Sequence, residues 1–136
     1  MSILAIDYGA RRIGIAVSDS GVLATPHSVV RNEGDVVGKI AAIGQQLGAE
    51  LFVVGIARRA SGTAGEGRFR DFAERLRQKT CKEVVLWDEA LTTVEASERL
   101  RAAGRTRRDT ERSIDMHAAA VILQSFLDER SSRRPS

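Results

Sequence analysis

Cysteine, aromatic residues and long apolar runs are scarce in this chain of 136 residues. Because Cys81 is the single cysteine, no disulfide can form within the chain, and no Cys/His cluster suggests a zinc site. No apolar stretch approaches the roughly 20 residues that a membrane span requires. The N-terminal segment MSILAIDYG has no basic stretch before its apolar run, so we interpret it as a strand and not as a signal peptide. We therefore expect a cytoplasmic protein without membrane association.

Aromatic residues make up 4% of the chain and hydrophobic residues 43%, so the core must consist mainly of Val, Ile, Leu and Ala. The length suits one domain with a single core. We expect this domain to span residues 1–130 and the basic segment 131–136 to be a disordered tail.

Arginine carries almost all of the positive charge. The net charge is +3, the pI is about 9.6, and of 21 Lys and Arg residues only Lys39, Lys79 and Lys82 are lysines. Arginine favours bidentate contacts with phosphate. A solvated face explains any one arginine cluster, but several clusters lie close in sequence to acidic residues, which favours a nucleic-acid surface. The candidate contacts are Arg11, Arg12, Arg58, Arg59, Arg105, Arg107, Arg108 and Arg112.

The first part of the chain predicts three strands. Residues 2–7 are an apolar run, 12–17 alternate, and 23–30 form a third strand whose Pro26 suggests the edge of a sheet. The short connections between them predict an antiparallel meander.

The rest of the chain alternates between helices and buried strands. We expect one helix to begin at Asn32 and two more to begin at capping boxes, Thr63 with Glu66 and Thr92 with Glu95. Strands are expected at 51–56 and 83–87, and a last helix over 113–129. The order β-β-β-α-β-α-β-α-α predicts an α/β fold with a mixed five-stranded sheet. The meander comes first, two parallel strands follow, and helices cover both faces.

Three acidic residues stand at the ends of expected elements. Asp7 ends the first strand, Glu89 follows the last strand, and Asp115 lies in the first turn of the last helix. Such positions converge at the carboxyl edge of a parallel sheet, where α/β folds bind ligands. Carboxylates suit hard divalent cations, and two ions can activate water and stabilise a leaving oxygen. We therefore predict a catalytic site that holds Mg²⁺ or Mn²⁺, with two ions when substrate is bound.

Simpler roles compete with this interpretation. Asp115 also suits a helix dipole. Asp88 competes with Glu89 for its role, and Asp19 competes for the site in general. His117 is an accessory candidate together with Asp88, although an ordinary histidine on the helix surface is the favoured interpretation.

Small and hydroxyl-bearing residues lie near these acids. Gly9 allows either a tight turn or a close approach of the substrate backbone. Thr92 and Thr93 are candidate phosphate contacts, although Thr92 is also explained as a helix cap. Trp87 belongs more plausibly to the core than to a base-stacking platform.

The strings DYGARRIGIAVSD, DEALTTVEA and DMHAAAVILQSFL, in this order and spacing, resemble the YqgF/RuvX family over residues 3–128. Its members are described as pre-16S rRNA nucleases or Holliday-junction resolvases. The resemblance implies an RNase H-like fold and a metal-dependent nuclease whose partners are RNA or DNA and a ribosome precursor. The matched family positions are the acids Asp7, Glu89 and Asp115, together with Gly9, Gly14, Thr92 and Thr93.

The chain departs from the family pattern in two places. Ala90 stands where the family commonly has Arg, which removes a cation beside the site. In the loop GIARRASG, Ala57 replaces Pro and Ser61 replaces Asp, with Arg58 and Arg59 between them. Both departures bear on which nucleic acid is held and how.

The sequence leaves other functions open. Asp7, Gly9 and Gly14 also fit the phosphate loop of actin-like ATPases and sugar kinases, but those enzymes need two lobes and 136 residues supply one. A ribosome-assembly or nucleic-acid-binding protein on the same fold would bind without cutting. The choices between RNA and DNA, endo- and exonucleolytic cutting, and monomer and homodimer are undecided.

Overall fold

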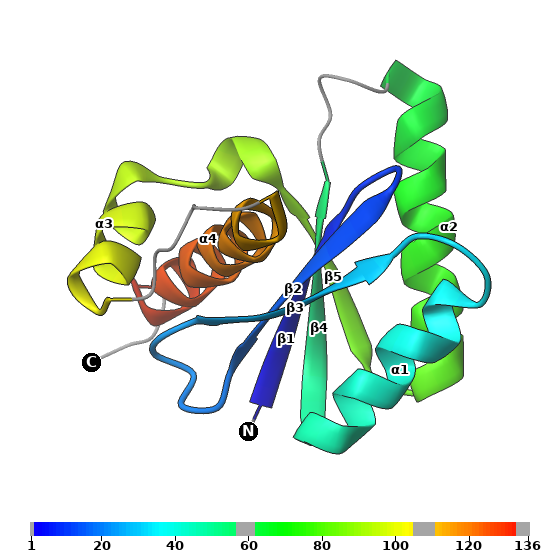
Figure 1. Ribbon diagram of the computed structural model, residues 1–136, viewed down its shortest axis with the longest axis horizontal. Coiled ribbons are helices and arrows are strands. Elements are labelled where there is room, and N and C mark those ends of the chain that lie inside the picture. The colour runs from blue at the N-terminus through cyan, green and yellow to red at the C-terminus, as the bar shows by residue number, and fades with distance from the viewer. Residues whose placement is uncertain (1, 57–61, 105–110, 133–136) are drawn as a thin grey trace.

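The computed structural model describes residues 2–56, 62–104 and 111–132; at 62–66, 111–113 and 132 the description covers the backbone alone. The elements follow the predicted order, with one short 3-10 helix between the last strand and the helix after it (Figure 1). They are β1 (Ser2–Tyr8), β2 (Arg12–Ser18), β3 (Thr25–Arg31), α1 (Val36–Leu47), β4 (Ala49–Ile56), α2 (Gly62–Thr80), β5 (Glu83–Asp88), η2 (Glu89–Leu91), α3 (Val94–Ala102) and α4 (Glu111–Ser132).

The strands form one mixed sheet in the spatial order β3-β2-β1-β4-β5. β2 pairs antiparallel with β1 and β3, whereas β4 pairs parallel with β1 and β5, which confirms the predicted meander and parallel strands. Pro26 lies on the edge strand β3, as predicted. The β2–β3 register shifts between Ile15 and Ala16, where Ala16 is opposite this proline, a residue with no N–H to donate.

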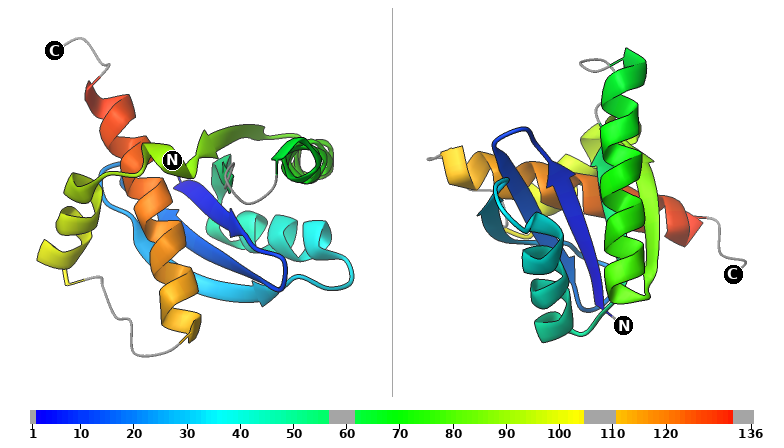
Figure 2. Two further views of the ribbon diagram at one scale, coloured as in Figure 1. Left: turned by 90° about the horizontal axis from the view of Figure 1, so that it is seen from above. Right: turned by 90° about the vertical axis from the view of Figure 1, so that its right-hand side faces the viewer.

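Helices cover both faces of the sheet: α1 and α2 lie on one face, and α3 and α4 on the other (Figures 1 and 2). Each face has its own apolar core. Along β1, Leu4 and Ile6 join the core beneath α1 and α2, whereas Ile3 and Ala5 join the core beneath α4. Because side chains alternate along a strand, Asp7 continues the row of Ile3 and Ala5 on the α4 face.

The start of α1 differs from the prediction. The N-cap is Asp35, whose side chain accepts from the backbone N–H of Gly38 at 3.0 Å, so the predicted cap Asn32 is wrong. Asn32 instead donates from Nδ2 to the carbonyl of Gly9 at 2.8 Å and thereby ties the loop before α1 to the β1–β2 turn. The C-cap of the helix is Gly48, which has a left-handed φ of 67°.

Two other helix starts also differ. The N-cap of α3 is Thr93, whose side chain accepts from Ala96 N at 3.0 Å, whereas Thr92 closes η2. The prediction that Thr92 caps α3 was wrong because the 3-10 turn takes up one more residue than the pattern suggested. The helix α2 already begins at Gly62, so Thr63 lies within the helix and not at the N-cap position.

The last helix is longer than predicted. α4 runs from Glu111 to Ser132, so it begins before residue 113 and continues into the segment expected to be a tail. Residues 133–136 of that segment lie outside the described part of the chain. No helix in the described ranges is both long and apolar enough to cross a membrane.

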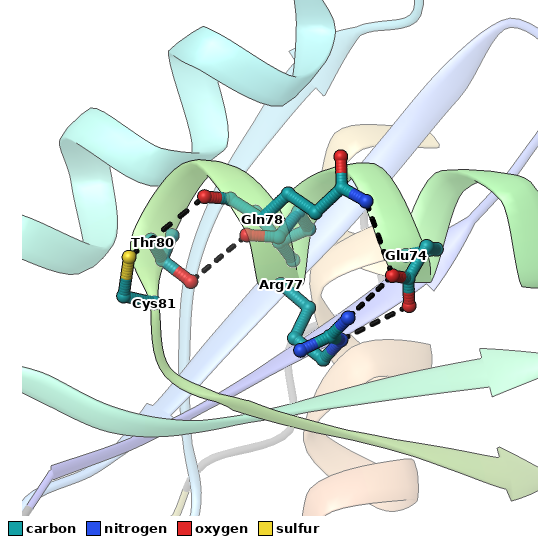
Figure 3. Close-up of polar contacts among 6 residues, drawn as sticks. Glu74, Arg77, Gln78, Thr80 and Cys81 are labelled. Atoms are coloured by element: carbon teal, nitrogen blue, oxygen red, sulfur yellow. Dashed lines mark hydrogen bonds and ion pairs between the residues drawn. The ribbon is translucent and has the colours of Figure 1, made fainter.

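Local polar contacts fix the end of α2 (Figure 3). Arg77 and Gln78 both donate to the carboxylate of Glu74, and Thr80 Oγ1 donates at 2.8 Å to a carbonyl one turn back. Cys81 follows with a φ of 58° and donates its backbone N–H to the carbonyl of Arg77 at 2.8 Å. The helix therefore ends on a left-handed residue that is not glycine, a conformation that costs about 1–2 kcal/mol.

Candidate active site

A row of residues crosses the sheet at the carboxyl end of β1. Asp7 is opposite Gly14 on β2 and opposite Gly55 on β4, and Gly55 is opposite Trp87 on β5. The row lies on the face that α4 covers. Two glycines therefore flank the half-buried acid, and their lack of side chains leaves room for the helix above it.

Gly14 receives the backbone of α4 itself. A Cβ at position 14 would lie 2.1 Å from the carbonyl oxygen of Asp115, far inside any real contact distance. The first described turns of α4 therefore rest directly on β2, beside Asp7. This packing brings Asp115 to the same edge of the sheet as Asp7, although the two residues are far apart in the sequence.

Gly55 has the matching role further along the helix. A Cβ there would lie 2.4 Å from Cδ1 of Ile122. A glycine inside a buried strand marks a close approach of this kind. We did not single out Gly55 from the sequence, although its place in the apolar run LFVVGI was the available signal.

The segment after β5 brings in the third acid. Asp88 caps η2, because its Oδ1 accepts from the backbone N–H of Ala90 at 2.9 Å. Glu89, the first residue of η2, is hydrogen-bonded through its side chain to Asp7. Burial, this hydrogen bond and the charges of Glu89 and Asp115 together raise the pKa of Asp7 from 3.8 to about 7. Glu89 and Asp115 therefore both act electrostatically on Asp7.

Arg12 lies at the same edge and contacts the acids. Its Nε donates to Oδ2 of Asp115 at 2.6 Å, and the side chains are 43% and 23% exposed, respectively. Arg12 was predicted as a nucleic-acid contact. Its pairing with Asp115 was not foreseen, because sequence spacing does not show which side chains meet across β2 and α4.

The donor set fits a hard divalent cation. The three acids offer only carboxylate oxygens, the ligands that Mg²⁺ and Mn²⁺ prefer. A cation would offset the burial and the repulsion that contribute to the raised pKa of Asp7. In the described part of the chain, no group of three or more His, Cys, Asp or Glu side chains already has metal-binding geometry. Asp115 is instead bonded to Arg12 and Asp7 to Glu89, so a cation site would require both acids to change partners.

The structure places the competing acids elsewhere or in other roles. Asp19 follows β2 at the opposite edge of the sheet, beside the start of β1, and accepts from Ser2 Oγ at 3.0 Å. Asp88 is explained by capping η2. His117 is only 6% exposed, so the favoured interpretation of a surface histidine is wrong: this turn of α4 faces the sheet.

The smaller predicted residues serve local structure. A Cβ on Gly9 would lie 2.3 Å from the carbonyl oxygen of Arg12, so the tight β1–β2 turn accounts for this glycine. Thr92 Oγ1 donates to the carbonyl of Glu89 at 2.7 Å and fixes the segment that carries that acid. Thr93 is the cap of α3. Both threonines therefore have a structural role, and their contacts with phosphate stay a prediction.

Most of the predicted arginine surface falls outside the described structure. Arg11 is exposed beside the β1–β2 turn. The backbone of Arg112 lies in α4, without a described side chain. Outside the described ranges lie Arg58, Arg59, Arg105, Arg107 and Arg108.

Two solved structures show the class of fold. The RuvC protein of T. thermophilus in complex with a Holliday junction substrate matches with a TM-score of 0.67 at 14% identity, over 96% of each chain. The fowlpox virus Holliday junction resolvase matches with a TM-score of 0.60 at 9% identity, over 96% of this chain and 99% of that one. The protein therefore has the RNase H-like fold implied by its motifs.

The family follows from the sequence matches. The model of the RuvX family, described as "Holliday junction resolvase", matches residues 1–129, and the chain belongs to this family. Two curated relatives are named "Putative pre-16S rRNA nuclease". The protein from Nitratidesulfovibrio vulgaris is 38% identical over 98% of both chains, and that from Mycolicibacterium paratuberculosis is 42% identical over 93% of this chain and 80% of its own. The predicted enzyme class, a hydrolase acting on nucleic acid, is confirmed.

Proposed function

We propose that this protein is a divalent-metal-dependent nuclease that hydrolyses phosphodiester bonds in the 5′ region of pre-16S rRNA. The observation that carries the proposal is the meeting of Asp7, Glu89 and Asp115 at the carboxyl edge of the sheet, expressed in the pKa of Asp7 of about 7. An acid with so high a pKa is stabilised as a carboxylate when a cation binds beside it.

Asp7, Glu89 and Asp115 would hold Mg²⁺ or Mn²⁺, and two ions are expected once substrate phosphate adds its oxygens. Bound there, the metal supplies activation of water and stabilisation of the leaving oxygen. The protein's own contribution is to set the acids in place. Gly14 seats the backbone of Asp115 on β2, and Asp88 and Thr92 fix the turn that carries Glu89.

Asp7 is the central acid of this arrangement. It interacts with both other carboxylates and lies at the end of a strand that is paired on both sides. Arg12 neutralises part of the charge of Asp115, and it is half-exposed, so it can exchange that partner for a phosphate. Arg11 adds an exposed cation at the same edge. The arginines within residues 57–61 and 105–110, which lie outside the described ranges, are expected from the sequence to hold the nucleic-acid backbone.

The choice of RNA rests on the names of the curated relatives, which specify pre-16S rRNA. A second candidate is a Holliday-junction nuclease. The description of the matching family model and the junction-bound RuvC structure, which has the same fold, support it. A non-catalytic assembly factor on this fold is the third candidate, and it would retain nucleic-acid binding without cutting.

The test is cleavage of three labelled substrates, a ribosomal-precursor leader RNA, single-stranded DNA and a four-way DNA junction, with Mg²⁺, Mn²⁺ or EDTA. Wild-type protein is compared with Asp7→Asn and with the matched control Asp19→Asn, which changes an acid at the opposite edge. We expect metal-dependent cutting of the leader RNA that Asp7→Asn abolishes and Asp19→Asn retains. Preferential cutting of the junction would support the second candidate. Binding without cutting of any substrate would contradict the nuclease.

A further inference from the structure

A groove of about 590 Å³ lies beside the turn that carries Glu89, between η2, the start of α3 and the second half of α4. It is of the size that proteins use for small organic ligands. Its lining residues are Trp87, Ala90, Leu91, Thr92, Thr93, Ser125, Asp128 and Glu129. None of the predicted catalytic acids lines it, so it is a separate site that adjoins them.

The groove is firmly connected to the catalytic edge. Ala90 and Leu91 immediately follow Glu89 in η2. Thr92 Oγ1 donates to the carbonyl of Glu89 at 2.7 Å, and Ser125 Oγ accepts from the backbone N–H of Thr93 at 3.3 Å. These bonds fasten one wall to the acid-bearing turn and to α4. A ligand in the groove would therefore be held at a fixed distance from Glu89.

Part of the lining of the groove is apolar. Trp87 packs edge-to-face against Phe126, with 5.5 Å between ring centroids. Its indole N–H is buried and has no hydrogen-bond partner among the described residues. Leu91 is 53% exposed, which is unusual for so large an apolar side chain. Ala90 adds a small residue where a longer side chain would fill the space.

Another part of the lining is acidic. Asp128 accepts from Gln124 Nε2 at 3.1 Å and faces Arg99 Nε at 3.5 Å, so its carboxylate is held in place. Glu129 is the other acid, and within the described structure the lining includes no Lys or Arg. A carboxylate has about four lone-pair sites, which leaves acceptor capacity at Asp128. A phosphate group would be repelled here, whereas groups that donate hydrogen bonds would be stabilised.

We propose that this groove receives one unstacked nucleobase of the substrate strand and prefers bases that carry an amino group, adenine, cytosine and guanine, over uracil and thymine. The apolar residues Trp87 and Leu91 are available to the ring, and the acidic lining residues offer acceptors to its amino group. Stacking on aromatic side chains is a common way to hold single-stranded bases. The proposal rests on the proposed nuclease function, because the base belongs to the strand cut at the adjoining acids.

The test uses Trp87, the single tryptophan of the chain, as a fluorescent reporter. Adenosine, cytidine, guanosine and uridine are titrated in EDTA, so that binding is measured without cleavage. Ala90→Phe fills the groove. The matched control is Val94→Phe, which adds the same ring at a residue that is 70% exposed and does not line the groove. Neither variant alters the tryptophan.

We expect saturable quenching by the three amino-bearing nucleosides and a dissociation constant about tenfold higher or more for uridine. Ala90→Phe should weaken binding by about tenfold or more, and Val94→Phe should leave it nearly unchanged. If Ala90→Phe fails to fold, Glu129→Gln provides the second test, with a selective loss of the preference over uridine.

Four results would overturn the proposal. Non-saturable quenching, or equal binding by wild type and Ala90→Phe, would mean that no base enters the groove. Competition by inorganic phosphate would make it an anion site. A change in elution volume for Ala90→Phe alone would assign the groove to self-association. If the protein cuts RNA but gives any of these results, only the base-site proposal fails. If nucleosides quench the fluorescence saturably but the protein cuts no substrate, the base site stands and the nuclease function is contradicted.

Discussion

The carbonyl oxygen of Asp115 lies so close to Gly14 that a Cβ at position 14 would be only 2.1 Å from it. Gly14 is opposite Asp7 in the β1–β2 ladder. One glycine therefore sets the distance between the strand that carries the first acid and the helix that carries the third. The geometry of the candidate active site depends on a residue that has no chemistry of its own.

Gly14→Ala should push the start of α4 away from the sheet and destabilise the protein by about 1–3 kcal/mol, the usual cost of an overpacked core. Metal-dependent cleavage should fall further than stability alone explains, because Asp115 moves with the helix. Urea unfolding and cleavage of the leader RNA measure the two effects.

Gly55→Ala is the matched control for this prediction. Its new Cβ would meet the flexible end of Ile122, 2.4 Å from Cδ1. Ile122→Val removes that carbon, so the double variant should recover most of the lost stability and activity. The same second change should not rescue Gly14→Ala, since its obstacle is backbone. Rescue of both variants would show that Gly14 does not position Asp115.

The raised pKa of Asp7 predicts a pH-dependent stability in EDTA. Folding lifts this pKa from 3.8 to about 7, so between these values the folded state binds more protons than the unfolded state. The free energy of unfolding therefore falls as the pH rises through this window, and the loss is complete above pH 7. A shift of this size corresponds to at most about 4 kcal/mol, and sharing of the proton with Glu89 reduces it.

Asp7→Asn removes the buried charge and should stabilise the protein by about 1–3 kcal/mol at pH 8. At about pH 4 it should have little effect, because the wild-type acid is then protonated in the folded state. Thermal unfolding at both pH values gives the comparison, with Asp19→Asn as the control without a pH-dependent gain. An equal effect of Asp7→Asn at both pH values would contradict a raised pKa.

Arg12 should compete with divalent cations for Asp115. Arg12→Gln removes that competition and leaves the edge more negative, so the affinity for Mn²⁺ should rise by about two- to fivefold, the range expected for a half-exposed ion pair. Arg11→Gln makes the same charge change on the neighbouring residue and should raise the affinity less. Calorimetric titration of both variants decides the matter. If both variants gain the same affinity for Mn²⁺, Arg12 acts only through the net charge and does not compete for Asp115.

The end of α2 offers a stabilising substitution. Cys81 has a φ of 58°, and glycine adopts this conformation without the steric cost of a Cβ, so Cys81→Gly should raise the free energy of unfolding by about 1 kcal/mol. Cys81→Ala also removes the thiol but retains the Cβ, and it should give no such gain. Stabilisation by the alanine variant as well would point to the thiol rather than to the backbone.

The sheet could be predicted from the sequence because its signals are local. The runs of β1, β4 and β5, the alternation of β2 and the proline of β3 all fall within short windows, and the connections between them allow few topologies. Helix starts were less predictable. Asn32 and Thr92 are both good capping residues, yet the chain uses Asp35 and Thr93, since the loops before α1 and α3 take up extra residues.

The acids could be predicted from their places at element ends, but their contacts could not. The bond between Arg12 and Asp115 joins residues 103 positions apart and depends on how closely α4 approaches β2. That approach is set by Gly14, and sequence spacing alone does not reveal what a missing side chain makes room for. The burial of His117 follows from the same packing.

The central claim is that Asp7, Glu89 and Asp115 form one cation-binding catalytic site. Its most direct test is to measure Mn²⁺ binding at pH 8 by calorimetry and by electron paramagnetic resonance. Wild type is compared with Asp7→Asn, Glu89→Gln and Asp115→Asn, and Asp19→Asn is the control. We predict saturable binding by wild type and the control, and a loss of about tenfold or more in affinity for each of the other three variants. Binding that survives all three substitutions, or no binding by wild type, would contradict the account.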